Sequence, residues 1–569
     1  MRITPAVRIC ASVAVALLAL TACSTGTEQT PAPTTSTPGG APPPSPSGPS
    51  DAEAVQALAA PGPYEVAAAD YALDDLAVEG LSSPLEVEAQ VVGPVGATGP
   101  LPVVVLLHGY WASCWNPTTK DSSTAWPCPT GQEPIGNNRG FTYLQERLAS
   151  HGFLTVSVSA NGVNVLATDM GDDAGAAARS VLVRRHLDAL ANGAIGSLAQ
   201  WPSLDLRSVL LMGHSRGGEG VDRAAWEGAG SSAWTVKGVV LVGPTAFEPS
   251  PRSTTAVVAI SGDCDGDVGP SLGQAYVDRV ADPGLLRSSL LVRGANHNYF
   301  NTEWDENVSV SGGGYDDVVT EGGTVDPMCK ASSPTRLSPA DQRETLARGM
   351  TLVASALLGG SDIAGRVLDA SVDFPVTDGA RVWVTPTGHG RTSAAPDAST
   401  RVTATDGATA FVCRGVSETE QPQDCGRGAN QGLNPHWPNA SDGTVGPSAV
   451  EISWTRAGGS VSIRPSTPID LAGSTSLESR VAVGAEGSPV AFEVAITDTA
   501  GRSAELGVWG PIEAMPGGPV LPSRTWAQLL SLPLGDVPGV DLTRIATVTF
   551  RPMTESGRAW VLDLTTSPT

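Results

Sequence analysis

The sequence predicts an α/β fold with a doubly wound, mostly parallel sheet, followed by an all-β sandwich. Two patterns support this prediction. In the first part of the chain, short apolar runs alternate with helical stretches, as in a parallel sheet with helices on both faces. After about residue 365, short strand-like runs are instead separated by Gly, Pro, Asn and Asp turns, which is typical of a β-sandwich.

Individual elements follow from these patterns. The run 101–107 (LPVVVLL) is continuously aliphatic, as expected of a strand covered on both sides. We expect α/β strands at residues 85–92, 102–107, 153–159, 208–212, 236–242, 255–261 and 289–292, and helices at residues 142–150, 174–198, 217–226, 272–280 and 339–358. In the all-β part we expect strands at residues 449–455, 476–483, 490–498, 545–551 and 559–564, and one short helix near residues 526–530.

Length and composition suggest a domain plan. A chain of 569 residues exceeds the size of a usual single core, so two domains are expected, at residues 61–362 (α/β) and 363–569 (β-sandwich). Residues 23–60 are rich in Pro, Thr and Ser and are expected to form a disordered tether. The net charge of -24 argues against nucleic acid and anionic lipid headgroups as partners.

The N-terminus has the features of a secretory signal peptide. Arg2 and Arg8 precede an apolar run at residues 9–20, which is too short to span a membrane. The ending Leu20-Thr21-Ala22-Cys23 resembles a bacterial lipobox. That resemblance implies removal of residues 1–22, acylation of Cys23, and a lipid-anchored protein on the outer face of the cell membrane. Ordinary signal cleavage beside an incidental cysteine is the alternative.

A candidate nucleophile lies in the sequence Gly213-His214-Ser215-Arg216-Gly217. This G-x-S-x-G pattern follows an apolar strand and precedes a helix, which is the setting that a nucleophile elbow requires. Glycines on both sides of Ser215 allow the sharp turn that exposes its hydroxyl. A serine that falls by chance in a glycine-rich turn is the alternative.

These residues resemble the α/β-hydrolase superfamily, in which the acid and then the histidine follow the serine in the chain. Four histidines precede Ser215 and two fall in the expected β-sandwich, which leaves His297 in the loop after residues 289–292 as the base. The six histidines set aside are His108, His151, His186, His214, His389 and His436. Because a protonated imidazole cannot act as a base, we expect activity to fall below roughly pH 6.

The acid is expected directly after the strand at residues 255–261. Three aspartates lie there, and the superfamily's G-x-x-D-x-x-V pattern fits Asp265, with Asp263 and Asp267 as alternatives. The D-x-D-x-D spacing also resembles a calcium loop. The loop has Val268 where such loops have glycine and Gln274 where they have glutamate, so we expect no metal.

The oxyanion of the tetrahedral intermediate needs fixed donors. In this superfamily they are the N–H of the residue after the nucleophile, here Arg216, and an N–H from the turn after an earlier strand, here Tyr110 in His108-Gly109-Tyr110-Trp111. The Tyr110 ring, Trp111, Trp115 and Trp126 either line the acyl site or pack a long loop.

The GHSRGG and HGY sequences resemble the branch that holds chlorophyllases, polyester hydrolases and platelet-activating-factor acetylhydrolase-like enzymes. The likeness covers residues 63–358 and implies a serine esterase without cofactor, acting on a small-molecule or lipid-like ester. Residues 301–339 depart from the compact pattern as a long insertion. A dipeptidyl-peptidase-like serine peptidase on the same fold is the first alternative.

The second alternative is a non-catalytic, glycan-binding surface lipoprotein. The closing run 559–564 (AWVLDL) resembles the last strand of jelly-roll, galactose-binding-like modules, which implies a glycan contact. Packing support for the hydrolase is the other role considered for this part, and His389 and His436 are then loop residues without chemistry.

Six cysteines remain when Cys10 of the expected signal peptide and Cys23 are set aside. An even number in an exported chain favours disulfides over metal ligands. Nearest-neighbour pairing gives Cys114–Cys128, Cys264–Cys329 and Cys413–Cys425, one of fifteen connectivities. The second pair would attach the turn that carries Asp265 to the insertion after His297.

Overall fold

The computed structural model describes residues 49–568, except residues 80, 82, 168–172, 248–252, 270, 281, 319, 322–323, 378, 415–423, 426–447, 485–487 and 516–525. The expected signal peptide, Cys23, most of the expected tether and His436 lie outside the described residues. Residues 49–569 form one compact unit. Among the described residues, no helix has both the length and the apolar character needed to cross a membrane.

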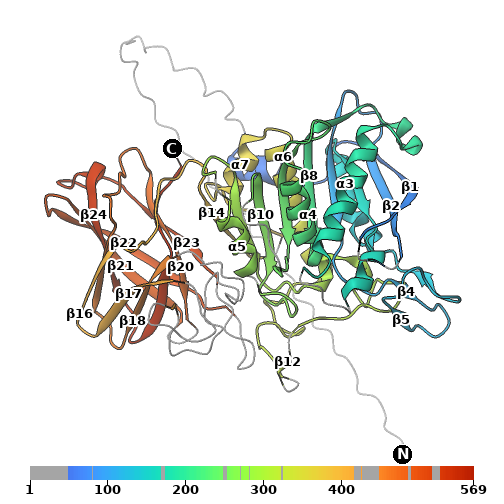
Figure 1. Cartoon of the computed structure of the whole chain (residues 1–569). Helices are drawn as coiled ribbons and strands as arrows, with labels where there is room; N and C mark the ends of the chain where they lie inside the picture. The colour runs from blue at the N-terminus through green and yellow to red at the C-terminus, as the bar shows by residue number, and fades with distance from the viewer. Residues whose placement is uncertain are drawn as a thin grey trace, which may run out of the picture. The chain divides into compact units, whose positions relative to one another are not determined.

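A nine-stranded sheet forms the centre of the first part, in the order β1-β2-β7-β3-β8-β9-β10-β11-β14 (Figure 1). The six strands from β7 to β11 in this order are parallel, and β2 and β14 run antiparallel to their neighbours at the two sides. This arrangement confirms the prediction of a mostly parallel sheet. The strands are β1 (Val66–Leu76), β2 (Leu85–Pro94), β3 (Leu101–Leu107), β7 (Leu154–Val158), β8 (Leu204–His214), β9 (Val236–Val242), β10 (Ala256–Gly262), β11 (Arg287–Val292) and β14 (Val382–Thr387).

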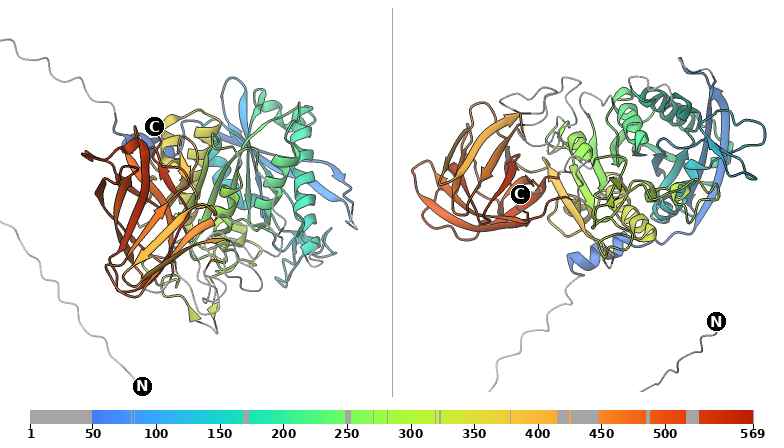
Figure 2. Two further views of the ribbon diagram at one scale, coloured as in Figure 1. Left: turned by 60° about the vertical axis from the view of Figure 1, so that its left-hand side comes forward. Right: turned by 90° about the horizontal axis from the view of Figure 1, so that it is seen from below.

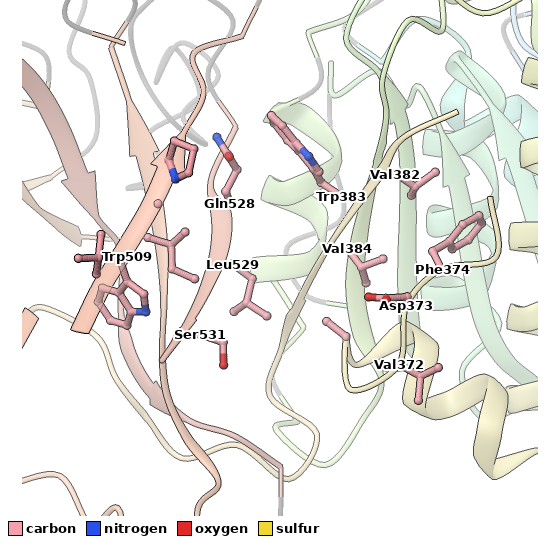
Figure 3. A pocket seen from close by; sticks show the side chains of 15 residues that line it. Val372, Asp373, Phe374, Val382, Trp383, Val384, Trp509, Gln528, Leu529 and Ser531 are labelled. Atoms are coloured by element: carbon pink, nitrogen blue, oxygen red, sulfur yellow. The ribbon is translucent and has the colours of Figure 1, made fainter. Parts of the chain in front are cut away.

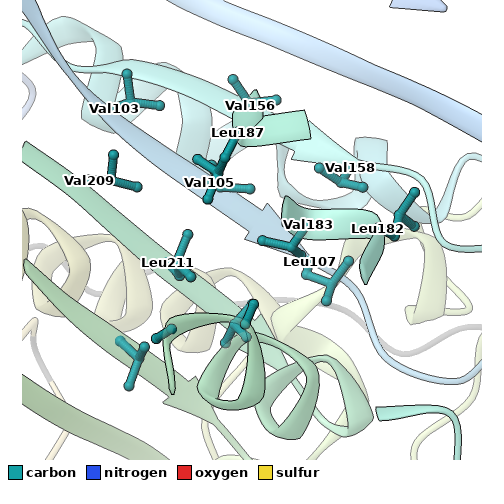
Figure 4. Packing of buried hydrophobic residues seen from close by; sticks show 14 of the residues in the cluster. Val103, Val105, Leu107, Val156, Val158, Leu182, Val183, Leu187, Val209 and Leu211 are labelled. Carbon is teal, nitrogen blue, oxygen red and sulfur yellow. The ribbon is translucent and has the colours of Figure 1, made fainter. Parts of the chain in front are cut away.

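Helices cover both faces of this sheet (Figure 2). Side chains of β3 alternate between the two faces, as a strand requires. Val103, Val105 and Leu107 pack with residues of α3, such as Leu182 and Leu187 (Figure 4), and with residues of α4 and α5. Val104 and Leu106 pack with residues of α1, α2, α6 and α7. The helices are α1 (Asp51–Ala59), α2 (Thr142–Ser150), α3 (Ala176–Ala191), α4 (Arg216–Glu227), α5 (Ser271–Asp278), α6 (Pro339–Leu357) and α7 (Asp362–Leu368).

The α/β part extends beyond both of its expected limits. Its last strand, β14, pairs with β11 over six residues, and Ala364 and Val367 of α7 are buried in the same core as α6. At the other end α1 occupies residues expected to be tether. Ser50 begins it with a capping box to Glu53, and Val55 is buried. The α/β part therefore reaches from α1 to Thr387.

Two details of the expected elements are wrong. The helix expected at residues 174–198 ends at Ala191, because Gly193 adopts a positive φ of 64° and its N–H bonds to the Leu190 carbonyl. The short helix expected near residues 526–530 is instead the strand β23 (Gln528–Pro533), which pairs with β20. Pairing with β20 outweighs the local preference of this segment for a helix.

Two antiparallel sheets make up most of the second part and share one hydrophobic core, which includes Trp454, Phe492, Trp509 and Phe550. The first holds β15 (Ser393–Ala394), β17 (Ala408–Arg414), β18 (Ser448–Trp454), β20 (Ser476–Val483), β23, β25 (Gly557–Val561) and β26 (Leu564–Thr566). The second holds β16 (Arg401–Thr405), β19 (Ser460–Arg464), β21 (Val490–Asp498), β22 (Ser503–Ile512) and β24 (Ile545–Pro552). The prediction of an all-β second part is confirmed.

The two parts are joined by polar contacts as well as by the chain. Gln274 of α5 makes hydrogen bonds of 2.9 and 3.0 Å with the backbone of Ala527, and Arg480 of β20 forms an ion pair of 2.6 Å with Asp278. A cavity of about 420 Å³ lies beside these contacts, with Trp383 of β14 and Leu529 of β23 among its lining residues (Figure 3).

Minor elements lie in the loops. Three short strands form a small sheet before α2, and two form a ribbon before α6: β4 (Cys114–Trp115), β5 (Ser122–Ser123), β6 (Glu133–Pro134), β12 (Thr320–Glu321) and β13 (Thr324–Val325). Disulfides join Cys114–Cys128, Cys264–Cys329 and Cys413–Cys425, so the nearest-neighbour pairing is confirmed.

Candidate active site

Ser215 occupies a sharp turn between β8 and α4. Its backbone angles are φ 57° and ψ -129°, a conformation that residues other than glycine rarely adopt. The turn is fixed on two sides, because the Ser215 N–H donates to the Val242 carbonyl at 2.8 Å and the Ser215 carbonyl accepts from the Gly218 N–H at 2.9 Å. A strained residue held by its surroundings in this way is typical of a functional position.

The two glycines of the pattern are required by close packing. A Cβ atom at Gly217 would lie 2.5 Å from the Leu107 carbonyl oxygen, and one at Gly213 would overlap the Gly217 carbonyl. Both contacts are with backbone atoms, which cannot swing aside. The elbow can therefore form at this point only if both flanking positions lack a side chain.

The turn at residues 108–110 lies directly against Ser215. A Cβ at Gly109 would lie 2.5 Å from Ser215 Cβ and 3.1 Å from its Oγ. The fully buried His108 ring holds this turn in place, since its nitrogens bond the Gly109 carbonyl and the Ala160 N–H, each at 2.9 Å. Burial lowers the pKa of His108 to about 3, so this imidazole is neutral and structural.

Tyr110 and Arg216 flank the serine on these two turns. Neither backbone N–H has a hydrogen-bond acceptor among the described residues, so both are free to donate to a bound oxygen. Their side chains are also in contact, because the Arg216 guanidinium lies 4.5 Å from the centre of the Tyr110 ring and 5.4 Å from that of Phe247. Exposed Phe247 and half-buried Tyr110 therefore both contact the Arg216 guanidinium, the side chain that follows Ser215.

Asp265 and His297 form a buried pair at the ends of β10 and β11. Asp265 Oδ2 lies 2.8 Å from His297 Nδ1, and each side chain is about 1% exposed. The other carboxylate oxygen, Oδ1, accepts the N–H groups of Asp267 (2.9 Å) and Val268 (2.6 Å), which fixes its orientation. A carboxylate held in this way fixes the tautomer and direction of the imidazole.

The two competing aspartates have other positions. Asp263 accepts hydrogen bonds from the Arg293 guanidinium and the Gly294 N–H, both at 2.5 Å, and so holds the backbone before His297. Asp267 is 66% exposed, and its Oδ2 lies 3.9 Å from His297 Nε2. Of the three carboxylates, Asp265 is therefore the one that pairs with Nδ1.

Several carboxylates act on the charge of His297. Burial alone would lower the pKa of this imidazole, but the adjacent Asp265, and then Asp317 and Asp267, outweigh burial and raise its pKa to about 9. The imidazole is therefore protonated at neutral pH in the absence of substrate.

Ser215 and His297 are neighbours without a mutual hydrogen bond. His297 Nε2 has no hydrogen-bond partner among the described residues. The backbone nonetheless brings the two residues together through Val242 and Gly243. The Ser215 N–H donates to the Val242 carbonyl, and a Cβ atom at Gly243, the residue after Val242, would lie 3.0 Å from His297 Nδ1. Hydrogen bonds of this kind often form only when substrate binds. The link between the serine and the histidine stays a prediction.

An aromatic stack, which sequence reasoning found only in part, borders the same histidine. Trp304 lies parallel to the His297 ring at 6.3 Å, and Trp111 stacks between Trp304 (5.0 Å) and Tyr315 (5.4 Å). Trp304 and Tyr315 belong to the insertion after His297, where no family pattern guides a prediction. Of the three tryptophans considered from the sequence, Trp111 stacks on the rings that lie beside His297.

His214, which precedes Ser215, is buried among rings. It lies 4.6 Å from Trp304 and 4.7 Å from His297, and burial lowers its pKa well below the usual value. A neutral ring here avoids a second positive charge beside His297. The His389 side chain is exposed, and its backbone N–H donates to the Pro283 carbonyl at 2.7 Å.

Among the described residues, no group of three or more His, Cys, Asp or Glu side chains is placed to hold a metal ion. No protein-family model matches this chain, and no curated protein sequence matches it. The chemistry is therefore inferred from the geometry of Ser215, Asp265 and His297.

Proposed function

We propose that this protein is a serine hydrolase of the α/β-hydrolase class that cleaves carboxylic esters. The observation that carries the proposal is the buried Asp265–His297 pair beside a serine in a strained strand-to-helix turn. The strand–turn–helix context of Ser215 and the chain order of serine, aspartate and histidine support the same class. No cofactor is needed for this chemistry.

In the proposed reaction, Ser215 Oγ attacks the ester carbonyl carbon while His297 Nε2 takes the hydroxyl proton. The N–H groups of Tyr110 and Arg216 stabilise the oxyanion of the tetrahedral intermediate. His297 then passes the proton to the leaving alkoxide, which departs as the alcohol and leaves an acyl-serine. Water, deprotonated by His297, attacks this acyl group, and the regenerated serine regains its proton as the carboxylic acid leaves. Asp265 stabilises the imidazolium throughout.

The surroundings of the site favour an apolar or aromatic substrate group. Partly exposed Trp111 and exposed Tyr315 stack on the histidine side, and the Tyr110 and Phe247 rings lie beside Arg216, the residue after Ser215. Ring surfaces of this kind bury apolar groups favourably. We therefore propose a small-molecule or lipid-like ester as the substrate.

Labelling with a fluorophosphonate probe, together with hydrolysis of p-nitrophenyl butyrate, tests the proposal. Wild-type protein should bind the probe covalently and hydrolyse the ester, and Ser215→Ala should lose labelling and at least about 10³-fold of kcat. Ser474→Ala, at a partly exposed serine of the all-β part, is the matched control and should behave as wild type. Unchanged ester turnover in Ser215→Ala would rule out this nucleophile.

A serine peptidase is the second candidate, and the exposed Asp267 carboxylate near His297 Nε2 favours it, because a carboxylate there attracts a substrate ammonium group. Parallel assays with an aminoacyl anilide and with p-nitrophenyl butyrate separate the two activities. If Asp267 binds an amine, Asp267→Asn should raise KM for the anilide and leave KM for the ester unchanged. Preference for the anilide would make the peptidase the better assignment.

We propose that the protein is anchored outside the bacterial cell membrane through a lipid on Cys23. The lipobox-like sequence supports this, and metabolic labelling with an alkyne fatty acid, lost in Cys23→Ser, would test it.

For the jelly-roll-like second part, we propose packing support for the hydrolase, which the contacts of Gln274 and Arg480 support. Glycan contact is the alternative, to be tested by retention on polysaccharide gels.

A further inference from the structure

The insertion after His297 places a carboxylate between the two turns of the candidate site. Asp317 Oδ2 accepts the N–H groups of Gly266, at 2.9 Å, and of His297, at 3.0 Å. Asp317 Oδ1 accepts the N–H group of Asn298 at 2.8 Å. One side chain is therefore bound to the residue after Asp265, to His297 itself and to the residue after His297.

These three bonds join segments that come from different strands. Gly266 belongs to the turn after β10, and His297 belongs to the turn after β11. The distance between Asp265 and His297 depends on how these two turns lie relative to each other. A single acceptor that bonds both backbones limits their relative movement, since moving either turn would break a hydrogen bond to Asp317.

Asp317 is itself held in place by its neighbours. The preceding residue, Asp316, accepts the Asn296 side-chain amide at 2.8 Å and forms an ion pair of 2.7 Å with Arg336. The Cys264–Cys329 disulfide attaches the same insertion to the turn after β10. The insertion is thus fixed at both sides of the point where Asp317 enters the site.

The charge of Asp317 also acts on the base. Among the described residues it forms no ion pair with arginine or lysine, and its charge is one of those that raise the pKa of His297. Burial and the nearby Asp265 raise the pKa of Asp317 to about 6, and the His297 charge opposes that rise. Asp317 is therefore ionised at neutral pH, when the imidazolium is present.

We propose that Asp317 is a positioning residue, which holds the turns of Asp265 and His297 in register and stabilises the charged imidazole without touching substrate. This inference rests on the proposed hydrolase function. Residues outside the family pattern would thus supply part of the support that the acid–base pair needs.

Two substitutions separate the charge of Asp317 from its geometry. Asp317→Asn keeps an oxygen for Gly266 and His297 but removes the charge and turns an amide N–H₂ toward Asn298. Asp317→Glu keeps the charge and moves the carboxylate. Asp282→Asn is the matched control, because Asp282 is an exposed aspartate that also accepts a backbone N–H, from Gly284 at 2.8 Å.

The measurements are the pH profile of kcat with p-nitrophenyl butyrate and the pKa of His297 from an NMR titration of its ring protons. Asp317→Asn should lower the His297 pKa and move the acid limb of the profile to lower pH. Its plateau kcat should fall by about tenfold or more, because small misplacements of catalytic groups are costly. Asp317→Glu should lose plateau kcat with a smaller shift of the acid limb, and Asp282→Asn should match wild type.

A folded Asp317→Asn protein with the wild-type His297 pKa and wild-type plateau kcat would overturn the inference and leave the hydrolase assignment intact. Failure of the proposed function has a different signature, namely wild-type protein that neither hydrolyses esters nor reacts with fluorophosphonate. The NMR titration still decides the electrostatic role in that case, and an unshifted His297 pKa would overturn it.

Discussion

Asp263 and Asp265 lie two residues apart in one turn but bind different partners: Asp263 pairs with Arg293 at 2.5 Å and Asp265 with His297 at 2.8 Å. The first pair stabilises the backbone that leads to the histidine, and the second orients the histidine ring. Substitutions at these two positions should therefore have different consequences.

Asp265→Asn should lower kcat by about 10³- to 10⁴-fold with little loss of stability, because the amide no longer favours the imidazolium or its correct tautomer. Asp263→Asn should instead lower the free energy of unfolding by about 3 kcal/mol, since it leaves the buried Arg293 charge without its nearest partner. Urea denaturation and initial-rate assays on both variants test this contrast. Equal loss of kcat in the two folded proteins would contradict the assignment of Asp265 as the acid.

Activity should depend on pH through His297. Because its pKa is raised to about 9, the fraction of neutral imidazole, which acts as base, increases as the pH rises through about 9. We therefore expect kcat/KM to climb over this range, at higher pH than the usual value of a histidine suggests. A rate profile from pH 5 to 10, corrected for spontaneous hydrolysis, tests this. A plateau already reached near pH 7 would disagree with it.

The same group links pH to stability. The pKa of His297 is higher in the folded protein than the usual 6.5 of an unfolded chain, so the folded state binds the proton more tightly. The contribution of the protonated His297 to the free energy of unfolding is fully present below about pH 6.5 and is lost as the pH rises through about 9. Thermal melts of wild type and of His297→Ala should converge over this range, after allowance for other groups that titrate there.

The elbow should not tolerate a methyl group at Gly217. The new Cβ would meet the Leu107 carbonyl at 2.5 Å, so Gly217→Ala should lower the free energy of unfolding by about 1–3 kcal/mol and remove most activity. Gly365→Ala is a suitable control, because this glycine lies in α7 with open space around it. That change should be neutral or stabilising by up to about 1 kcal/mol. Circular dichroism melts and ester assays provide both measurements.

The disulfides should differ in importance. Cys264–Cys329 closes a span of 65 residues and holds the insertion against the acid turn, whereas Cys413–Cys425 closes a span of 12. Replacing the first pair by serine should lower the free energy of unfolding by about 4 kcal/mol and reduce kcat. Replacing the second pair should cost less stability and leave kcat unchanged. The opposite order in melting temperature and rate would show that the insertion does not support the site.

Local sequence patterns were enough to single out the residues that form much of the candidate site. The strand, glycine turn and helix around Ser215 are continuous in the chain, and one histidine remained after elimination. The choice among Asp263, Asp265 and Asp267 depended on a family pattern, because side-chain direction within a turn depends on contacts with distant residues such as Arg293 and His297. These contacts are visible only in three dimensions.

Other features could not be predicted because they depend on long-range packing. Asp317 and Trp304 lie in an insertion with no periodic pattern, and they reach the site through the folding of that loop. The helix α1 follows a low-complexity segment, and its packing partners, which include α6 and α7, are distant in the sequence. β23 resembles a short helix in its local sequence, and pairing with β20 decides its conformation.

The position of β14 has a practical consequence for anyone who wishes to isolate the α/β part. A polypeptide ended at residue 362 would retain Ser215, Asp265 and His297 but would lack the strand that shields β11. The unpaired backbone N–H and C=O groups of β11, together with the apolar side chains of Leu290 and Leu291, would then be available for pairing with another molecule. Such a fragment should precipitate or self-associate during expression, so we expect that a fragment made for assays of the proposed activity needs β14 through Thr387.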